Sequence, residues 1–260
     1  MSQRVGIVVP TLGERPDYLN KCLGSIRAAG DAHILLVAPD LMNTETLRSE
    51  GLIDSVVLDA GGGLPAAINQ GIRALPSPIE YVNWLGDDDL LTPSSLEATS
   101  KALDENPKAV MSFGACDYID EQGSTIWSNR SGQWAVPMLR FGPDLIPQPG
   151  ALIRRSAFIR AGELRTDLGW AFDFDLFIGL AKLGKLIYLN QTLAQFRWHP
   201  ESLSVEHRKK SVAEASQVRV SHLPAFVRPI SFLWEYPVQQ ATLVAGKRVT
   251  AKAKTKAKTK

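Results

Sequence analysis

Three consecutive aspartates, Asp87 to Asp89, follow the apolar segment Tyr81 to Leu85, which has the composition of a buried strand. Adjacent carboxylates repel one another and raise one another's pKa unless a cation neutralises them. Mg²⁺ and Mn²⁺ prefer oxygen ligands and bind through one or two carboxylates together with substrate phosphates. The triplet therefore predicts a site for Mn²⁺ or Mg²⁺ and a diphosphate. It is also consistent with solvated loop acids ahead of a helix that starts at Thr92-Pro93.

A second pair of carboxylates, Asp173 and Asp175, lies in an apolar segment that runs from Trp170 to Ala181. The apolar residues of this segment have helical spacing and predict a helix that starts near Asp173. Asp173 as the N-cap and Asp175 in the first turn would both complement the helix dipole, which is a purely structural role. The residues alone favour that structural role over a catalytic one.

The elements that must position these acids alternate between strand and helix patterns. Val5 to Thr11 has the pattern of a buried strand that stops at Pro10, and residues 16–29 have the pattern of an amphipathic helix. Further strands are expected at residues 34–38 and 55–58, and a helix at residues 65–74, before the Tyr81 strand. This alternation predicts a parallel sheet with helices on its faces. Ligands of such sheets bind at the carboxyl ends of the strands, where Asp87 to Asp89 would lie.

The order of six short blocks resembles the family 2 glycosyltransferases of GT-A fold. The blocks span residues 8–26, 63–72, 84–89, 148–155, 172–176 and 193–199. The resemblance implies an α/β fold of GT-A type, a single Rossmann-like domain with a mostly parallel central sheet flanked by helices. It also implies an inverting transfer of a sugar from a nucleotide-diphosphate donor to a hydroxyl acceptor, which would be a growing glycan or a lipid-linked saccharide.

The resemblance also assigns roles to the acids. Asp173 matches the catalytic base, which takes a proton from the acceptor hydroxyl, and Asp175 and Gln148 are expected at the acceptor. Asp88 or Asp89, with His199, would hold Mn²⁺ or Mg²⁺, which neutralises charge on the departing diphosphate. Gly86 stands where the family commonly has the first Asp of its metal motif. This departure leaves open which of the three carboxylates binds the metal.

Donor recognition is expected from residues of several blocks. The family reads the nucleobase with two acids after its second strand, whereas this chain offers Asp40 there, so UDP, dTDP and GDP sugars all stay open. Arg197 is expected at the diphosphate, because its guanidinium group suits phosphate oxygens. The expected donor-binding residues are Pro10, Thr11, Glu14, Asp40, Asn69, Asp87, Asp88 and Arg197.

Composition favours a soluble enzyme. The chain has 260 residues, enough for one α/β domain with a substantial core. Its two cysteines, Cys22 and Cys116, are expected to be buried free thiols of a reducing compartment. The N-terminus does not have the pattern of a signal peptide, and no segment is long and apolar enough for a transmembrane helix. We therefore expect a cytoplasmic protein.

The chain is expected to divide into three parts. A glycosyltransferase domain would span residues 1–215, with a donor half over residues 1–110 and an acceptor half over residues 111–215. A C-terminal helical extension would follow at residues 216–246, and a disordered Lys-rich tail at residues 247–260. The tail either keeps the protein soluble or binds anionic lipids at the inner face of the membrane.

Two alternatives to a glycosyltransferase share parts of these features. A sugar nucleotidyltransferase would share the sheet, metal and substrate, but residues 10–15 are a poor match to its Gly-rich, basic loop. A non-catalytic sugar-nucleotide binding protein of the same fold is a further alternative. Nucleic acid is not an expected partner, because the basic tail has no interleaved aromatic residues.

Overall fold

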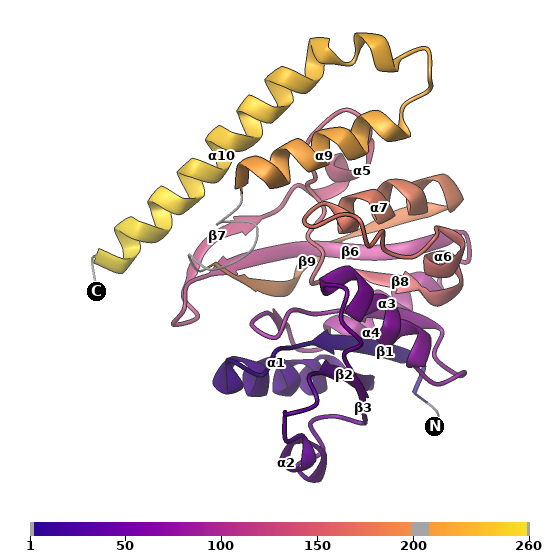
Figure 1. Cartoon of the computed structure of the whole chain (residues 1–260), viewed down its shortest axis with the longest axis vertical. Coiled ribbons are helices and arrows are strands. Elements are labelled where there is room, and N and C mark those ends of the chain that lie inside the picture. The colour runs from indigo at the N-terminus through magenta and orange to yellow at the C-terminus, as the bar shows by residue number, and fades with distance from the viewer. Residues whose placement is uncertain (1–2, 199–207, 259–260) are drawn as a thin grey trace.

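The computed structural model describes residues 3–198 and 208–258. Its strands are β1 (Val5–Pro10), β2 (His33–Ala38), β3 (Ser55–Leu58), β4 (Tyr81–Trp84), β5 (Leu90–Leu91), β6 (Ala109–Ile119), β7 (Thr125–Asn129), β8 (Leu152–Arg154) and β9 (Lys185–Arg197). They form one sheet in the order β3-β2-β1-β4-β8-β6-β9-β5, and β7 pairs with β6 at its side (Figure 1).

The N-terminal half of the sheet is parallel, as the alternating pattern predicted. β1 pairs in parallel with β2 and with β4, and β2 pairs in parallel with β3. The intervening helices are α1 (Pro16–Ala29), α2 (Glu45–Ser49) and α3 (Leu64–Ala74), and α4 (Ser95–Asp104) follows β5. The acidic triplet comes directly after β4, so it lies at the carboxyl end of this parallel half.

The C-terminal half of the sheet is mixed. β8 lies antiparallel between β4 and β6, whereas β9 runs parallel to β6 and antiparallel to β5. Its helices are η1 (Gly132–Trp134), α5 (Ala135–Met138), α6 (Arg155–Arg160) and α7 (Phe172–Leu183). The predicted helix near Asp173 is therefore present, but it begins at Phe172 with Ala171 as N-cap, so Asp173 is not the cap. Likewise, α4 begins at Ser95 and not at Thr92-Pro93.

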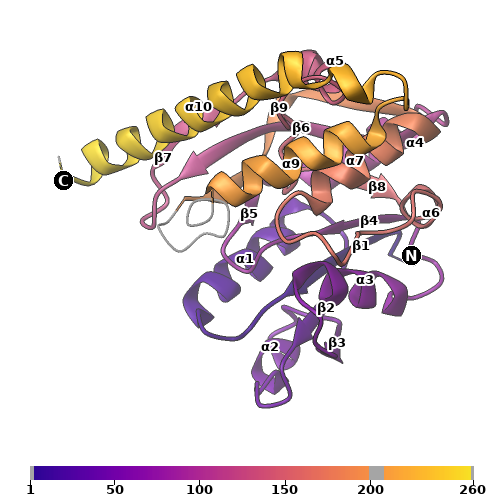
Figure 2. The ribbon, with the colours of Figure 1, turned by 45° about the horizontal axis from the view of Figure 1, so that its top comes forward.

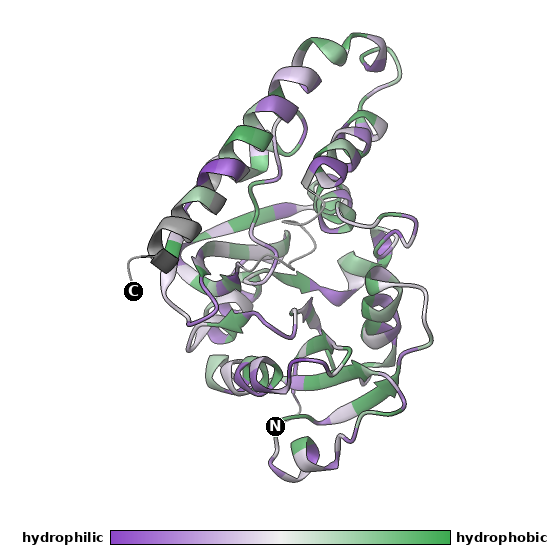
Figure 3. Cartoon of the chain, turned by 60° about the vertical axis from the view of Figure 1, so that its left-hand side comes forward, coloured by the Kyte–Doolittle hydropathy of each residue, from purple (hydrophilic) through white to green (hydrophobic). Residues whose placement is uncertain are grey.

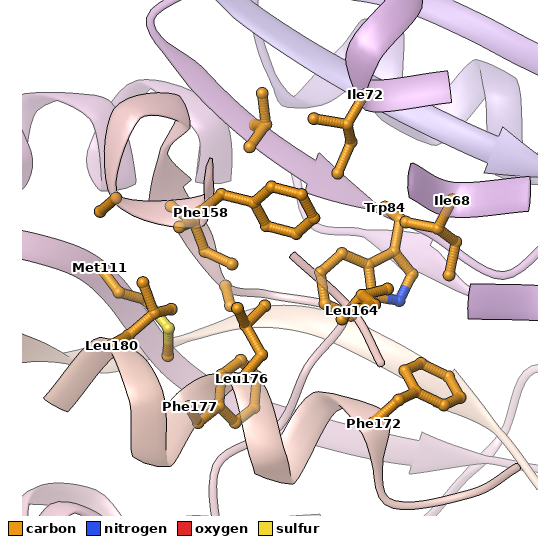
Figure 4. Packing of buried hydrophobic residues seen from close by; sticks show 14 of the residues in the cluster. Ile68, Ile72, Trp84, Met111, Phe158, Leu164, Phe172, Leu176, Phe177 and Leu180 are labelled. Atoms are coloured by element: carbon orange, nitrogen blue, oxygen red, sulfur yellow. The ribbon is translucent and has the colours of Figure 1, made fainter. Parts of the chain in front are cut away.

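Two hydrophobic clusters fill the two faces of the sheet. α1 and α4 cover one face, and α3, α6 and α7 cover the other (Figures 1 and 2). Hydrophobic residues are concentrated in the central strands, as the green colour of Figure 3 shows. Cys22 and Cys116 are buried free thiols, as expected. On the α3/α7 face, Trp84 of β4 and Phe172 of α7 pack with ring centroids 6.5 Å apart (Figure 4). These two side chains link the strand that precedes the acidic triplet to the helix that carries Asp173.

Two C-terminal helices form an additional layer outside α7. α9 (Arg208–His222) packs on α7, and a turn with η2 (Arg228–Ile230) leads to α10 (Phe232–Lys258), which packs along α9 (Figure 2). The predicted domain boundary at residue 215 is wrong, because it falls inside α9. Within the described residues, no helix is both long and apolar enough to span a bilayer.

The prediction of a disordered tail from residue 247 is also wrong. α10 continues without a break through residues 247–258. Ala and Lys both have high helix propensity, and beyond Gly246 the sequence contains neither Gly nor Pro, so a helix that starts earlier can propagate through it.

Candidate active site

The first part of the site forms where β1 and β4 end side by side. Thr11, just after β1, donates its hydroxyl to Asp87 Oδ2 at 2.5 Å and accepts the backbone N–H of Gly13 at 3.0 Å. Burial is the main cause that raises the pKa of Asp87, and Asp88 adds to it. Thr11 and Asp87 are both predicted to bind the donor, and the parallel register of β1 and β4 brings them into direct contact.

Asp88 and Asp89 differ sharply in their surroundings. Asp88 forms an ion pair with Arg15, with 3.2 Å between Oδ2 and the guanidinium nitrogen. Asp89 is only 5% exposed, and its Oδ1 accepts the backbone N–H of Arg197 at 2.9 Å. Burial first, and the charge of Asp88 second, raise the pKa of Asp89 well above its ordinary value. A cation at these carboxylates would offset the cost of burying negative charge.

The described residues fit a divalent cation that is held by one or two carboxylates. They contain no group of three or more His, Cys, Asp and Glu side chains arranged to enclose a metal. The carboxylate oxygens of Asp88 and Asp89 are the ligand type that Mn²⁺ and Mg²⁺ prefer. Gly86 contributes space, because a Cβ there would lie 3.0 Å from Asp88 Oδ1 and 3.2 Å from Asp89 Oδ2. His199, the third expected ligand, lies outside the described residues.

Arg197, the last residue of β9, binds the acidic turn, which is the turn that contains Asp87 to Asp89. Its guanidinium group donates to the backbone carbonyls of Asp88, Asp120 and Glu121 at 3.0 Å each, and lies over the ring of Tyr18. The side chain is 3% exposed. These contacts favour a structural role over the expected contact with the diphosphate, which stays a prediction.

The second part of the site is the start of α7. Asp173 Oδ1 accepts the backbone N–H of Phe174 at 2.8 Å. Burial of its carboxyl group raises the pKa of Asp173 to about 6, although this backbone hydrogen bond opposes the shift. A carboxylate with this pKa is a stronger base than an ordinary aspartate and is still ionised at neutral pH.

Asp144, in the loop between α5 and β8, is a residue that sequence reasoning missed. Burial first, and the charge of Asp173 second, raise its pKa well above the ordinary value. Burial is the main cause that raises the pKa of Tyr118, and the charges of Cys116, Asp144 and Asp89 add to it. No sequence motif marks Asp144, because only the folded loop brings it toward Asp173.

Two expected acceptor-binding residues contact other parts of the protein. Gln148 donates its amide to Asn83 Oδ1 at 3.0 Å and to the carbonyl of Trp84 at 2.8 Å, which places it beside the strand that leads to the triplet. Asp175 accepts from His222 Nε2 at 2.8 Å, so it links α7 to α9. The roles of Gln148 and Asp175 at the acceptor stay predictions.

The remaining residues predicted to bind the donor differ in how deeply they are buried. Asn69 is buried and exchanges two hydrogen bonds with the backbone of Leu164, which fits a structural role. Asp40 and Glu14 are exposed, and Pro10 is half-buried at the end of β1. Asp40, Glu14 and Pro10 lie in or directly after the ends of β1 and β2, where a donor nucleotide is expected.

Comparison with known proteins places most of the chain in one family. A model of glycosyl transferase family 2 matches residues 6–161. An uncharacterised glycosyltransferase of Rickettsia felis is 24% identical over 217 residues, 76% of this chain and 34% of that protein. The O-antigen biosynthesis protein RfbC of Myxococcus xanthus is 26% identical over 187 residues, 68% of this chain and 14% of that protein. The chain thus spans about a third or less of the length of these relatives.

Solved structures support the fold class. S. aureus TarS 1–349, in complex with UDP-GlcNAc, has a TM-score of 0.62 at 13% identity, covering 85% of this chain and 66% of that one. The mannosyltransferase PcManGT of Pyrobaculum calidifontis, in complex with GDP-Man and Mn²⁺, has a TM-score of 0.56 at 17% identity, covering 99% of this chain and 80% of that one. The expected α/β fold of GT-A type is confirmed.

Proposed function

Because this chain belongs to glycosyl transferase family 2, we propose that it transfers a sugar from a nucleotide-diphosphate donor to a hydroxyl group of a glycan or lipid-linked saccharide. The observation that supports the proposal most is that the strand before the acidic triplet packs on the helix that carries Asp173. Asp87 to Asp89 follow β4, Asp173 begins α7, and Trp84 packs on Phe172 between them. The triplet suits a diphosphate with its cation, and Asp173 suits the role of a base.

In the proposed reaction, Asp173 accepts the proton of the acceptor hydroxyl as its oxygen attacks the anomeric carbon. The bond to the diphosphate breaks on the opposite side, so the sugar inverts. The raised pKa of Asp173, about 6, suits this role at neutral pH. Asp144 and Asp173 together make the acceptor side acidic, which would orient acceptor hydroxyl groups by accepting hydrogen bonds from them.

We propose that Asp88 and Asp89, with His199, hold Mn²⁺ or Mg²⁺ against the donor diphosphate. When bound, the cation would supply Lewis-acid neutralisation of the charge that develops on the leaving group. PcManGT was solved with GDP-Man and Mn²⁺, and TarS with UDP-GlcNAc. These ligands make UDP and GDP sugars the first donors to test here, with dTDP sugars as the third class.

Titration calorimetry tests the donor site directly. UDP, dTDP and GDP are titrated into the protein with Mn²⁺, with Mg²⁺ and with chelator, and the series is repeated on Asp89→Asn and on the surface control Asp31→Asn. We expect one nucleotide to bind in a metal-dependent way, and only Asp89→Asn to weaken it. If none of the three nucleotides binds, the proposed transfer is wrong.

A peripheral contact with anionic lipid is proposed for α10. Leu233, Tyr236, Val244 and Lys247 lie on one helical face and are all exposed; the three apolar side chains are 64%, 68% and 48% accessible. Further lysines follow toward the end of the helix. A helix with apolar residues at one end and cations at the other suits the surface of an anionic membrane, where the protein would act on the cytoplasmic side.

A further inference from the structure

Glu214 of α9 reaches across to the loop that precedes α7. Its Oε1 accepts the backbone N–H groups of Trp170 and Ala171 at 2.7 and 2.6 Å, and its Oε2 accepts that of Gly169 at 3.0 Å. One carboxylate thus holds three consecutive N–H groups. Asp173 follows two residues after the last of them.

The last of these N–H groups, that of Ala171, belongs to the N-cap of α7, and the Ala171 side chain has no atom that could cap the helix. A helix N-terminus leaves backbone N–H groups without intrahelical partners, and a carboxylate there is further stabilised by the helix dipole. Glu214 supplies this carboxylate from a helix 43 to 45 residues further along the chain.

Arg219, one and a half turns further along α9, holds the neighbouring loop. It is 2% exposed, forms a buried ion pair with Glu235 of α10, and donates to the carbonyl of Gly142 at 2.9 Å. Its guanidinium group also lies 5.7 Å from the ring centroid of Phe174. The same helix therefore contacts the segment that leads to Asp173 and the segment that leads to Asp144.

The groups that act on the Asp173 carboxyl come from three elements. Burial is the main cause that raises its pKa, the backbone N–H of Phe174 on α7 opposes this rise, and the charge of Glu214 on α9 adds to it. In the α5–β8 loop, burial first and the charge of Asp173 second raise the pKa of Asp144. The charge of Arg219, which is paired with Glu235, opposes part of this rise in the pKa of Asp144. Replacement of Glu214 by a neutral residue removes one negative charge from this group, so the pKa of Asp173 should fall.

We infer that Glu214 is a positioning residue of the acceptor side: it fixes the backbone that presents Asp173 and adds negative charge beside this carboxylate. The inference rests on the proposed function, because it assumes that Asp173 is the base. It gives the C-terminal helices a specific role, since α9 lies beyond the part of the chain that matches the family model, residues 6–161.

The test compares the full-length protein with Glu214→Gln, Glu214→Asp and the control Gln217→Ala, an exposed position on the same helix. Gln keeps the shape but loses the charge, and Asp keeps the charge on a shorter side chain. Three quantities are measured. They are amide hydrogen exchange over residues 165–176, the titration of the Asp173 carboxyl by ¹³C NMR assigned with Asp173→Asn, and turnover of the sugar nucleotide whose base binds in the calorimetry.

We expect faster exchange of the Gly169 to Ala171 amides and a lower pKa of Asp173 in Glu214→Gln, and a kcat about 10-fold lower at unchanged donor KM. Glu214→Asp should show smaller changes than Glu214→Gln in amide exchange, in the Asp173 pKa and in kcat, and Gln217→Ala should match the wild type. Unchanged exchange and an unchanged Asp173 titration in Glu214→Gln would overturn the inference. Absence of turnover in the wild type would count against the proposed transfer instead, because exchange and titration are measured without any substrate.

Discussion

At the scale of single residues, the carboxylates of the site are distinguished by their partners. Asp88 has Arg15 as a counter-ion, whereas the buried Asp89 has a backbone N–H and Asp173 has the N–H of Phe174. A backbone N–H stabilises a carboxylate less than a full positive charge does. Burial is the main cause that raises the pKa of both Asp89 and Asp173, and the backbone hydrogen bonds offset only part of it. We propose that a cation neutralises Asp89 and that Asp173 acts as the base.

Replacement of Asp173 by Asn should separate binding from transfer. The amide keeps the shape but cannot take the acceptor proton, so we expect kcat to fall about 100-fold or more. Donor affinity should stay at the wild-type value in calorimetry. Asp167→Asn, at an exposed aspartate nearby, is the matched control. Equal loss of activity and donor affinity would contradict the assignment, and full activity would exclude Asp173 as the base.

Activity should also depend on pH through Asp173. Only the ionised carboxylate can accept a proton, and its pKa is about 6, so kcat should decline as the pH falls from 7 to 5. An ordinary aspartate would keep its activity down to about pH 4. The measurement is kcat at saturating donor and metal across this range. A flat profile between pH 7 and 5 would show that another group limits the reaction.

At the scale of elements, the packing of the N-terminal half depends on the close approach of α3 to the sheet. A Cβ at Gly71 would lie 2.5 Å from Val8 Cγ1 and 2.9 Å from Val37 Cγ2. The helix carries Asn69 and packs on β1, which ends at the proposed donor site. A glycine at position 71 therefore sets the distance between this helix and the strands beneath it.

Gly71→Ala should destabilise the fold by about 1–3 kcal/mol, because an added methyl group must displace two packed valines. Gly24→Ala on α1 is the matched control, since a Cβ there meets nothing within 4 Å. The control should be neutral or slightly stabilising, because Ala favours helix. Chemical denaturation of both variants measures the difference, and equal stabilities would contradict the packing argument.

At the scale of the whole molecule, α10 exposes several large apolar side chains, among them Leu233, Tyr236 and Val244. It packs along α9 and also contacts β7, and its C-terminal end extends beyond β7 (Figure 1). Phe226 and Phe232, at the turn between α9 and α10, are 83% and 66% exposed. Apolar side chains at one end and cations at the other give this helix two separate means of contact with a lipid surface.

Flotation with vesicles tests this contact. The full chain should float with vesicles that contain anionic lipid and less so as salt rises, since each cation near the surface contributes about 1 kcal/mol that salt screens. A chain that ends at Gly246 should float less, and vesicles of purely zwitterionic lipid are the control. Equal flotation of the two chains would exclude the cationic segment as the cause.

Predictions that rest on local sequence patterns were more accurate than predictions that depend on contacts between distant segments of the chain. Periodicity located β1, α1, β3 and α7 to within one or two residues, because those patterns reflect which side of each element is buried. The prediction of a disordered tail was wrong because it considered only the composition of residues 247–260. α10 starts at Phe232, and extending an existing helix by further residues is easier than starting a new one. The boundary at residue 215 was wrong because the packing of α9 on α7 leaves no local signal.

The sequence by itself determined the family, the alternation of strands and helices, and the identity of the acids at the ends of β4 and at the start of α7. These depend on local patterns and on the order of short motifs. Only the tertiary structure decided which side chains meet: Thr11 with Asp87, Arg197 with the acidic turn, and Glu214 with the loop before Asp173. Such contacts join residues tens of positions apart, and their formation depends on how the chain packs.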